Sequence, residues 1–116
     1  MNNLGKKAEK LSTEYLQNKG YKIIQSNFES SFGEIDIICK IDKILVFVEV
    51  KARSTTDFGY PREFVNLSKQ RKIIKTAEYF LYLNDYHNFQ PRFDVIEVYL
   101  NDNNRINHIE NAFITE

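Results

Sequence analysis

Two apolar segments separated by a very short connection constrain the fold more than any other feature of the chain. Residues 33–40 and 44–51 are rich in Ile, Val, Leu and Phe, and Asp42-Lys43 lies in the turn between them. β-branched and aromatic residues favour strands, and a connection of about two residues is typical of a β-hairpin. We therefore predict that these segments form an antiparallel hairpin.

The flanking segments predict an α/β or α+β layer fold of order αβββαββ. Apolar residues recur at helical spacing from Leu4 to Tyr15 and predict a helix over residues 4–19. A second helix is expected from Ser68, its predicted N-cap, with an apolar face formed by Ile73, Ile74, Ala77, Phe80 and Leu81. Further strands are expected at 21–27, 92–100 and 105–114, and a loop at 52–63. This order predicts a mixed central sheet covered by the helices.

Chain length and composition indicate one compact unit. The 116 residues are within the usual size of a single domain, so we expect one domain over residues 1–116. The lone Cys39, expected in the core, excludes an internal disulfide and a cysteine-rich zinc site. The longest apolar run, 44–48, is far shorter than a membrane span of roughly 18 residues. We expect a cytoplasmic protein without a membrane partner, with His87 and His108 at its surface.

The formal net charge of zero hides an uneven distribution of charge along the chain. Residues 1–22 hold five basic and two acidic side chains, and residues 51–75 hold seven basic and two acidic ones. Such basic segments permit binding to nucleic acid, although the net charge alone does not predict it. The side chains expected to contact nucleic acid are Arg53, Ser54, Lys69, Gln70, Lys72 and Lys75. For Lys72 and Lys75 an ordinary solvated helix face or a dimer contact stays open.

Charged residues interrupt both strands of the predicted hairpin. Glu34 and Asp36 share one face of the first strand, and Glu49 and Lys51 share one face of the second, because side chains alternate along a strand. If the numbers of the residues paired across the hairpin sum to an odd value, as 41 and 44 do, the two charged faces lie on the same side of the sheet. Asp36 then lies opposite Glu49, and Glu34 lies opposite Lys51.

This crowding of carboxylates predicts a metal site. Two carboxylates about 4 Å apart repel by roughly 4 kcal/mol at an effective dielectric near 20, and a bound cation relieves the repulsion. Ligand sets made only of oxygen suit Mg²⁺ or Mn²⁺ better than Zn²⁺. Lys51 beside such a metal would stabilise negative charge on a phosphoryl group. The alternative is a salt-bridged polar face on a half-exposed sheet.

The spacing of these residues resembles a known signature. Asp36, twelve intervening residues and Glu49-Val50-Lys51 are similar to the D…(D/E)xK pattern of the restriction-endonuclease-like nucleases, whose core order is αβββαβ. More closely, the chain resembles the YraN family of small bacterial proteins, which is commonly likened to archaeal Holliday junction resolvases. This resemblance covers about residues 5–100 and rests on Gly5, Glu9, Tyr15-Leu16, Gly20-Tyr21, Asn27, residues 33–36 and 47–51, Arg53, Phe58-Gly59, Lys69, Ala77 and residues 92–94.

The resemblance implies a role for each residue of the site. Asp36 and Glu49 would be metal ligands, with the carbonyl of Val50 as a third, and Lys51 would position water or stabilise charge. Glu9 would complete the site from the first helix, and its place at the margin of the apolar stripe allows this independently. Gln70 is similar to the Gln of a Gln-xxx-Tyr element in related nucleases, although Ile74 stands at the Tyr position.

These expectations combine into a restriction-endonuclease-like domain that uses Mg²⁺ or Mn²⁺ to cleave branched or irregular DNA. Two alternatives remain open. One is a nucleic-acid-binding module that keeps the fold and the site but hydrolyses little. The other is a scaffold protein whose carboxylates serve only the fold. A homodimer is one oligomeric state consistent with the sequence.

Overall fold

The elements of the molecule follow the predicted order. The computed structural model describes residues 3–54 and 65–113. Its elements are α1 (Asn3–Asn18), β1 (Lys22–Glu29), β2 (Glu34–Ile41), β3 (Ile44–Arg53), α2 (Leu67–Leu83), β4 (Gln90–Tyr99) and β5 (Arg105–Phe113). The αβββαββ order and the α+β class are therefore confirmed. β3 continues through Ala52 and Arg53, where a loop was predicted, and residues 55–63 of that loop lie outside the described residues.

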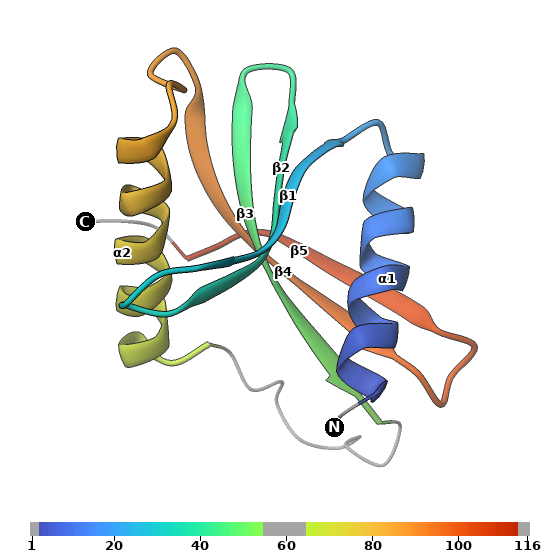
Figure 1. Ribbon diagram of the computed structural model, residues 1–116. Helices are drawn as coiled ribbons and strands as arrows, with labels where there is room; N and C mark the ends of the chain where they lie inside the picture. Colours follow the sequence, from blue (N-terminus) through green and yellow to red (C-terminus); the bar gives the residue numbers. More distant parts are fainter. Residues whose placement is uncertain (1–2, 55–64, 114–116) are drawn as a thin grey trace.

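The strands form one mixed sheet in the order β1-β2-β3-β4-β5. Neighbouring strands are antiparallel except β3 and β4, which are parallel. A parallel pair needs a long crossover connection, and α2 lies within this one. Figure 1 shows α1 and α2 on opposite sides of the sheet. Neither helix in the described part of the chain combines the length and apolar character that crossing a membrane requires.

Each face of the sheet has its own hydrophobic core, because side chains alternate along the strands. The core on the α1 side consists of Ala8, Leu16, Tyr21, Ile37, Cys39, Val46, Val48, Ile96 and Val98. The core on the α2 side includes Phe28, Ile35, Ile38, Leu45, Phe47, Ile73, Ala77, Phe80, Phe93 and Val95. The predicted burial of Cys39 is confirmed.

The start of α2 differs from the prediction. Its N-cap is Asn66 and not Ser68, which lies inside the helix. The Asn66 side-chain Oδ1 accepts a hydrogen bond from the main-chain N–H of Lys69 at 2.9 Å. Asn and Ser are both good N-caps, so the sequence pattern alone could not decide between positions two residues apart. The cap fixes where α2 begins and thereby places Lys69 in its first turn.

Candidate functional site

The predicted register of the hairpin is confirmed, and it brings two acidic residues together. The β2–β3 ladder runs from Ile41–Ile44 to Ile37–Val48. One position further, the main chains stop pairing, and Asp36 Oδ2 accepts a hydrogen bond from the main-chain N–H of Val50 at 2.7 Å. The Asp36 carboxyl group also interacts directly with the side chain of Glu49. The candidate site therefore lies where β2 and β3 separate.

Burial makes ionisation of this carboxyl pair unfavourable. Glu49 is 8% exposed, and burial together with the nearby Asp36 raises its pKa from 4.5 to about 7. The pKa of Asp36 is also raised, chiefly by burial, although the hydrogen bond from Val50 opposes the shift. Carboxyl groups that share a site favour a shared proton or an added cation.

Two lysines converge on one oxygen of this pair. The Nζ of Lys51 on β3 lies 3.8 Å from Glu49 Oε2, and the Nζ of Lys69 on α2 lies 3.5 Å from the same atom. Both ammonium groups lower the pKa of Glu49 and of Asp36, so they partly offset the burial of the pair. The sequence predicted the place of Lys51 beside Glu49, but assigned Lys69 only to a contact with nucleic acid.

Glu9 and Glu34 also lie near Asp36 and are linked by Asn27. When its amide nitrogen faces the two acids, Asn27 donates to Glu34 Oε2 at 3.2 Å and to Glu9 Oε1 at 3.3 Å. This orientation is assigned from the two acceptors. Burial and the charge of Asp36 raise the pKa of Glu9 and of Glu34. The predicted proximity of Glu9 to the site is thus present in the structure.

The expected pairing of Glu34 with Lys51 differs in the structure. Glu34 lies opposite Glu29 of β1, and the β2–β3 ladder does not reach it. Ile35 packs on the α2 side whereas Ile37 packs on the α1 side, so the regular alternation breaks at Asp36. Asn27 lies across from this break with a φ of 53°. Asn tolerates this left-handed conformation better than most residues. The asparagine at this position is therefore the one signal in the sequence that could have marked the break in alternation.

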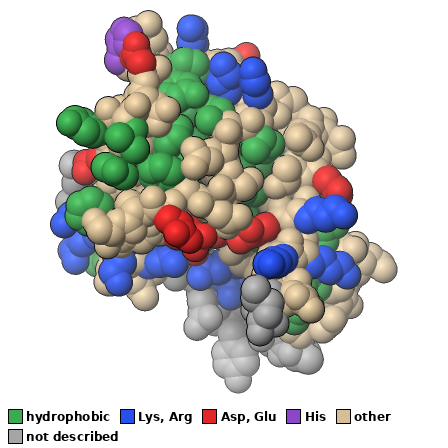
Figure 2. Space-filling model, in the orientation of Figure 1, with side chains coloured by type: hydrophobic (Ala, Val, Ile, Leu, Met, Phe, Trp, Pro, Cys, Tyr) green, Lys and Arg blue, Asp and Glu red, His purple; other side chains and the backbone are tan. Residues whose placement is uncertain are grey.

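The oxygen atoms at the site are of the kind that bind magnesium or manganese, but they are not arranged as a complete set of metal ligands. Asp36, Glu49 and the Val50 carbonyl offer only oxygen, and Mg²⁺ typically takes one or two protein carboxylates while keeping its waters. Among the described residues, no group of three or more His, Cys, Asp or Glu side chains is arranged to hold a metal ion. Figure 2 shows acidic side chains in the middle of one face with lysine and arginine side chains beside them.

A family match supplies the identity of the chain. The profile of the uncharacterised protein family UPF0102 matches residues 8–98, which include every residue of the site described above. The chain belongs to this family. The UPF0102 assignment agrees with the sequence-based resemblance to a family of small bacterial proteins, and it names no activity.

Relatives of this UPF0102 chain match it over nearly their whole length. A UPF0102 protein of Caldanaerobacter subterraneus is 46% identical over 114 residues, covering 95% of this chain and 93% of its own. One from Clostridioides difficile is 51% identical, covering 90% and 91%. One from Persephonella marina is 48% identical, covering 94% and 91%.

The residues predicted to contact nucleic acid occupy different environments in the UPF0102 fold. Lys72 and Lys75 are exposed on α2, as predicted. Gln70 Nε2 donates to the main-chain oxygen of Val65 at 2.7 Å. Two further predicted contacts pair with other residues of the protein: Arg53 Nε lies 3.3 Å from Glu97 Oε2, and Ser54 Oγ accepts from Asn101 at 3.3 Å. Neither Arg53 nor Ser54 therefore faces solvent as an unpaired group.

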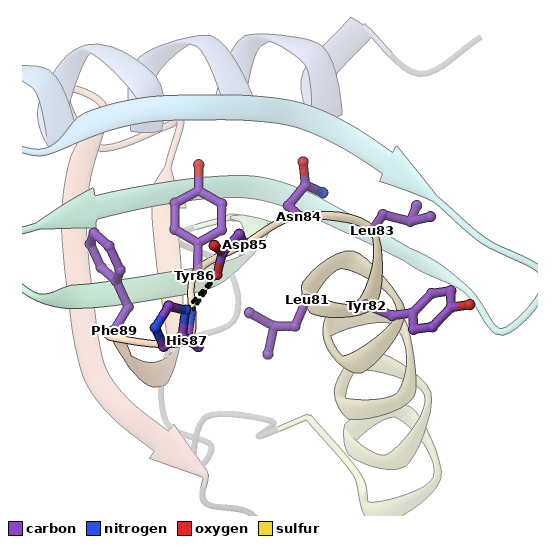
Figure 3. A pocket seen from close by; sticks show the side chains of 8 residues that line it. All are labelled: Leu81, Tyr82, Leu83, Asn84, Asp85, Tyr86, His87 and Phe89. Atoms are coloured by element: carbon purple, nitrogen blue, oxygen red, sulfur yellow. Dashed lines mark hydrogen bonds and ion pairs between the residues drawn. The ribbon is translucent and has the colours of Figure 1, made fainter.

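A cavity of about 610 Å³ lies away from the carboxylates, at the opposite end of α2. Figure 3 shows its lining: Leu81, Tyr82, Leu83, Asn84, Asp85, Tyr86, His87 and Phe89. Lys69 and Leu83 are separated by about 20 Å along the helix at 1.5 Å per residue. His87 pairs with Asp85 at 2.6 Å and is exposed, as predicted. The lining mixes apolar side chains with Asn84, Asp85 and His87, and none of its residues belongs to the acidic site.

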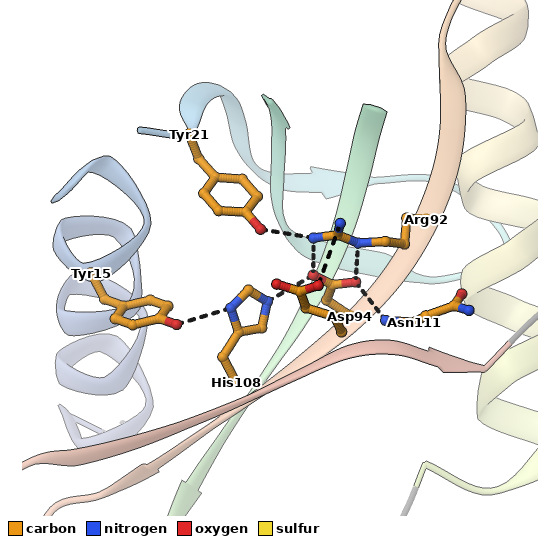
Figure 4. Close-up of polar contacts among 7 residues, drawn as sticks. Tyr15, Tyr21, Arg92, Asp94, His108 and Asn111 are labelled. Carbon is orange, nitrogen blue, oxygen red and sulfur yellow. Dashed lines mark hydrogen bonds and ion pairs between the residues drawn. The ribbon is translucent and has the colours of Figure 1, made fainter. Parts of the chain in front are cut away.

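A buried polar network on the α1 side corrects the prediction for His108. The His108 side chain is 6% exposed, its Nε2 lies 2.7 Å from Asp94 Oδ2, and its Nδ1 lies 3.1 Å from the Tyr15 hydroxyl. Arg92 contacts the same carboxylate and the Tyr21 hydroxyl, each at 2.8 Å (Figure 4). The polar neighbours of His108 in the sequence concealed these partners, which come from distant parts of the chain. The network ties α1 to β4 and β5.

Proposed function

We propose that this protein is a divalent-metal-dependent endonuclease that hydrolyses phosphodiester bonds in DNA, with a preference for branched or irregular structures. The carboxyl pair of Asp36 and Glu49 is the observation that carries the proposal. Its burial raises the pKa of both groups although Lys51 and Lys69 lie nearby, so a divalent cation bound at the pair would favour its ionised form. The resemblance to restriction-endonuclease-like nucleases supports the same activity, and the likeness to Holliday junction resolvases supports the substrate class.

Each part of the site has a task in this reaction. Asp36, Glu49 and the Val50 carbonyl would hold Mg²⁺ or Mn²⁺, which would supply charge stabilisation and an activated water. Lys51, 3.8 Å from Glu49, stabilises negative charge that develops on the phosphoryl oxygens. Glu9, held by Asn27, provides a carboxylate that accepts a hydrogen bond from the attacking water. Hydrolysis adds the water across one P–O bond, its hydroxyl to phosphorus and its proton to the leaving oxygen.

The proposal predicts metal-dependent cleavage that requires the carboxyl pair. Labelled single-stranded, duplex, flap and four-way DNA are incubated with the wild type over a titration of Mg²⁺ and Mn²⁺. Asp36→Asn combined with Glu49→Gln should lower the cleavage rate by about a hundredfold or more, since it removes the charge of the pair. Glu14→Gln and Glu78→Gln, at exposed positions of α1 and α2, are the matched controls. Equal rates in the wild type and the double variant would assign the cleavage to a contaminant.

One observation favours a second function, a binding module with the same fold and little hydrolysis. Within the described residues the acids do not form a ready three-ligand group, and two lysines already neutralise Glu49. Lys51→Met separates the two functions, because it removes the charge and keeps the apolar stem. For a nuclease it should slow cleavage with little change of DNA affinity in Ca²⁺. For a binding module the wild type should not cleave after repurification, and Lys51→Met should mainly weaken binding.

A further inference from the structure

The helical spacing of α2 directs Lys69 toward the sheet. Lys69, Ile73 and Ala77 follow one another at intervals of four residues and therefore lie on one side of the helix. Ile73 and Ala77 are buried, at 3% and 2% exposure, in the core below α2. Lys69 lies on the line of Ile73 and Ala77, one turn before the apolar core, and its side chain is 46% exposed. Lys72 and Lys75 are also exposed but lie off this line. The ammonium of Lys69 consequently reaches the gap between β2 and β3.

The local energetics of α2 do not favour a lysine at this position. Lys69 is the third residue of the helix, and the first turn contains no acidic residue. The N-terminus of a helix carries partial positive charge, so a cation there is unfavourable. Glu or Gln is the usual residue at this position when it takes part in capping. The favourable partner of Lys69 lies across the gap, at Glu49.

Lys69 acts on more of the acidic site than Lys51 does. Its Nζ lies 3.5 Å from Glu49 Oε2, closer than the 3.8 Å of Lys51. It lowers the pKa of Glu49 and Asp36, as Lys51 does, and also that of Glu34. The side chain is nevertheless 46% exposed, so it is free to turn toward solvent. Lys69 is thus the more exposed of two ammonium groups that share one carboxylate oxygen.

We propose that Lys69 is an exchangeable counter-ion, which neutralises Glu49 in the metal-free protein and moves to a phosphate of bound nucleic acid when a divalent cation occupies the carboxyl pair. The inference rests on the proposed function and adds to it a coupling between metal binding and nucleic-acid binding. A divalent cation brings two positive charges to Asp36 and Glu49 and repels both ammonium groups. Lys51 stays on its strand beside the site, while Lys69 gains a phosphate partner. Metal and nucleic acid then increase each other's affinity through Lys69.

Opposite effects on metal and DNA affinity test this exchange. Mn²⁺ alone is titrated at pH 8 into the wild type, Lys69→Met and Lys69→Gln, with binding followed by calorimetry and by the melting temperature. Removing a competing cation should tighten Mn²⁺ binding by about two- to fivefold, the size expected for a partly exposed ion pair. In Ca²⁺, the affinity for a labelled four-way DNA should fall in both variants. The slope of log affinity against log salt should become shallower by about 0.9, for one phosphate contact.

Lys22→Met, at an exposed position on β1, is the matched control and should leave both the Mn²⁺ affinity and the DNA affinity nearly unchanged. Wild-type Mn²⁺ binding with unchanged or weaker binding in both Lys69 variants would overturn the exchange and leave the nuclease proposal standing. A wild type without any response to Mn²⁺ would overturn both proposals. Tighter Mn²⁺ binding without loss of DNA affinity would also refute the exchange, because the released ammonium would have no phosphate partner.

Discussion

Asp36 and Asp94 show how the surroundings of a residue decide its role. Each carboxylate accepts a hydrogen bond from a main-chain N–H of a neighbouring strand, at 2.7 and 3.0 Å. Each also lies at a break in a strand ladder. Burial raises the pKa of Asp36, whose neighbour Glu49 is also acidic. Burial of Asp94 is outweighed by hydrogen bonds from His108 and Arg92, which hold its pKa below its ordinary value. The charge of the first aspartate is therefore only partly compensated, by Lys51 and Lys69, whereas the second pairs directly with Arg92.

The raised pKa of Glu49 predicts an inverse dependence of stability on pH. Folded Glu49, with a pKa of about 7, holds its proton more tightly than in the unfolded chain, where the ordinary value is 4.5. Between these values the folded state binds more protons, so the free energy of unfolding should fall as pH rises from 5 to 7.5, by on the order of 1–3 kcal/mol. Urea unfolding at fixed ionic strength measures this fall. Asp94 contributes only at lower pH, because its pKa is lowered.

Glu49→Gln is the control for this dependence, since its amide does not titrate and should flatten the profile. Mn²⁺ should raise the melting temperature of the wild type more at pH 8 than at pH 5.5, because protons compete for the same carboxylates. A wild-type profile that coincides with that of Glu49→Gln would show that Glu49 titrates normally and is not the buried acid described above.

The sequence predicted those residues of the site whose positions follow from local rules. A two-residue turn and the two-residue period of strands suffice to bring Asp36 beside Glu49, so their meeting could be predicted. Lys69 reaches Glu49 only through the packing of α2, although its spacing from Ile73 was a usable signal. His108 could not be placed, because Tyr15 lies 93 residues away in the sequence and the β4–β5 ladder shifts register beside Asp94, between Phe93 and Val95.

At the scale of elements, the Asp94 network fixes the helix that carries Glu9. Tyr15 joins α1 to His108 of β5, and Leu16, the next residue of the same helix, is fully buried. Glu9 lies six residues before Tyr15, a distance of about 9 Å along α1. The network on one face of the sheet thereby sets the position of a carboxylate that reaches the site between β2 and β3. The helical spacing of apolar residues predicts which side of α1 packs on the sheet. The hydrogen bond between Tyr15 and His108 depends instead on tertiary contacts.

Removing the centre of this network should destabilise the whole fold. Asp94 is fully buried, and Asp94→Ala would leave Arg92, whose side chain is 16% exposed, with only the exposed Glu110 at 3.8 Å as a carboxylate partner. Breaking a buried ion pair from one side costs about 3–5 kcal/mol, and urea unfolding at pH 7 measures the loss. Asp102→Ala is the matched control, since its 2.8 Å pair with Arg105 is exposed and should cost below about 1 kcal/mol. Equal losses in the two variants would contradict a special role for the buried network.

At the scale of the whole molecule, the two faces of the sheet carry different polar chemistry. The α1 face holds a neutralised network around Asp94, whereas α2 brings Lys69 to the carboxylates at the gap between β2 and β3. Beyond Lys69, the same helix exposes Lys72 and Lys75 to solvent. In a chain with zero net charge, this local excess of cations is what the proposed nucleic-acid contact depends on.

The exposed lysines of α2 should determine how DNA binding responds to salt. Each phosphate neutralised by a lysine releases counter-ions, so the slope of log affinity against log salt is steeper by about 0.9 per contact on duplex DNA. Lys72→Gln with Lys75→Gln should therefore flatten the slope by about two, measured by anisotropy of labelled DNA in Ca²⁺. Lys10→Gln with Lys22→Gln removes the same charge from exposed positions on α1 and β1 and should change the slope little. Equal flattening by both pairs of substitutions would indicate a diffuse effect of net charge. A wild-type affinity independent of salt would exclude phosphate contacts. Either result would contradict DNA binding at the exposed lysines of α2.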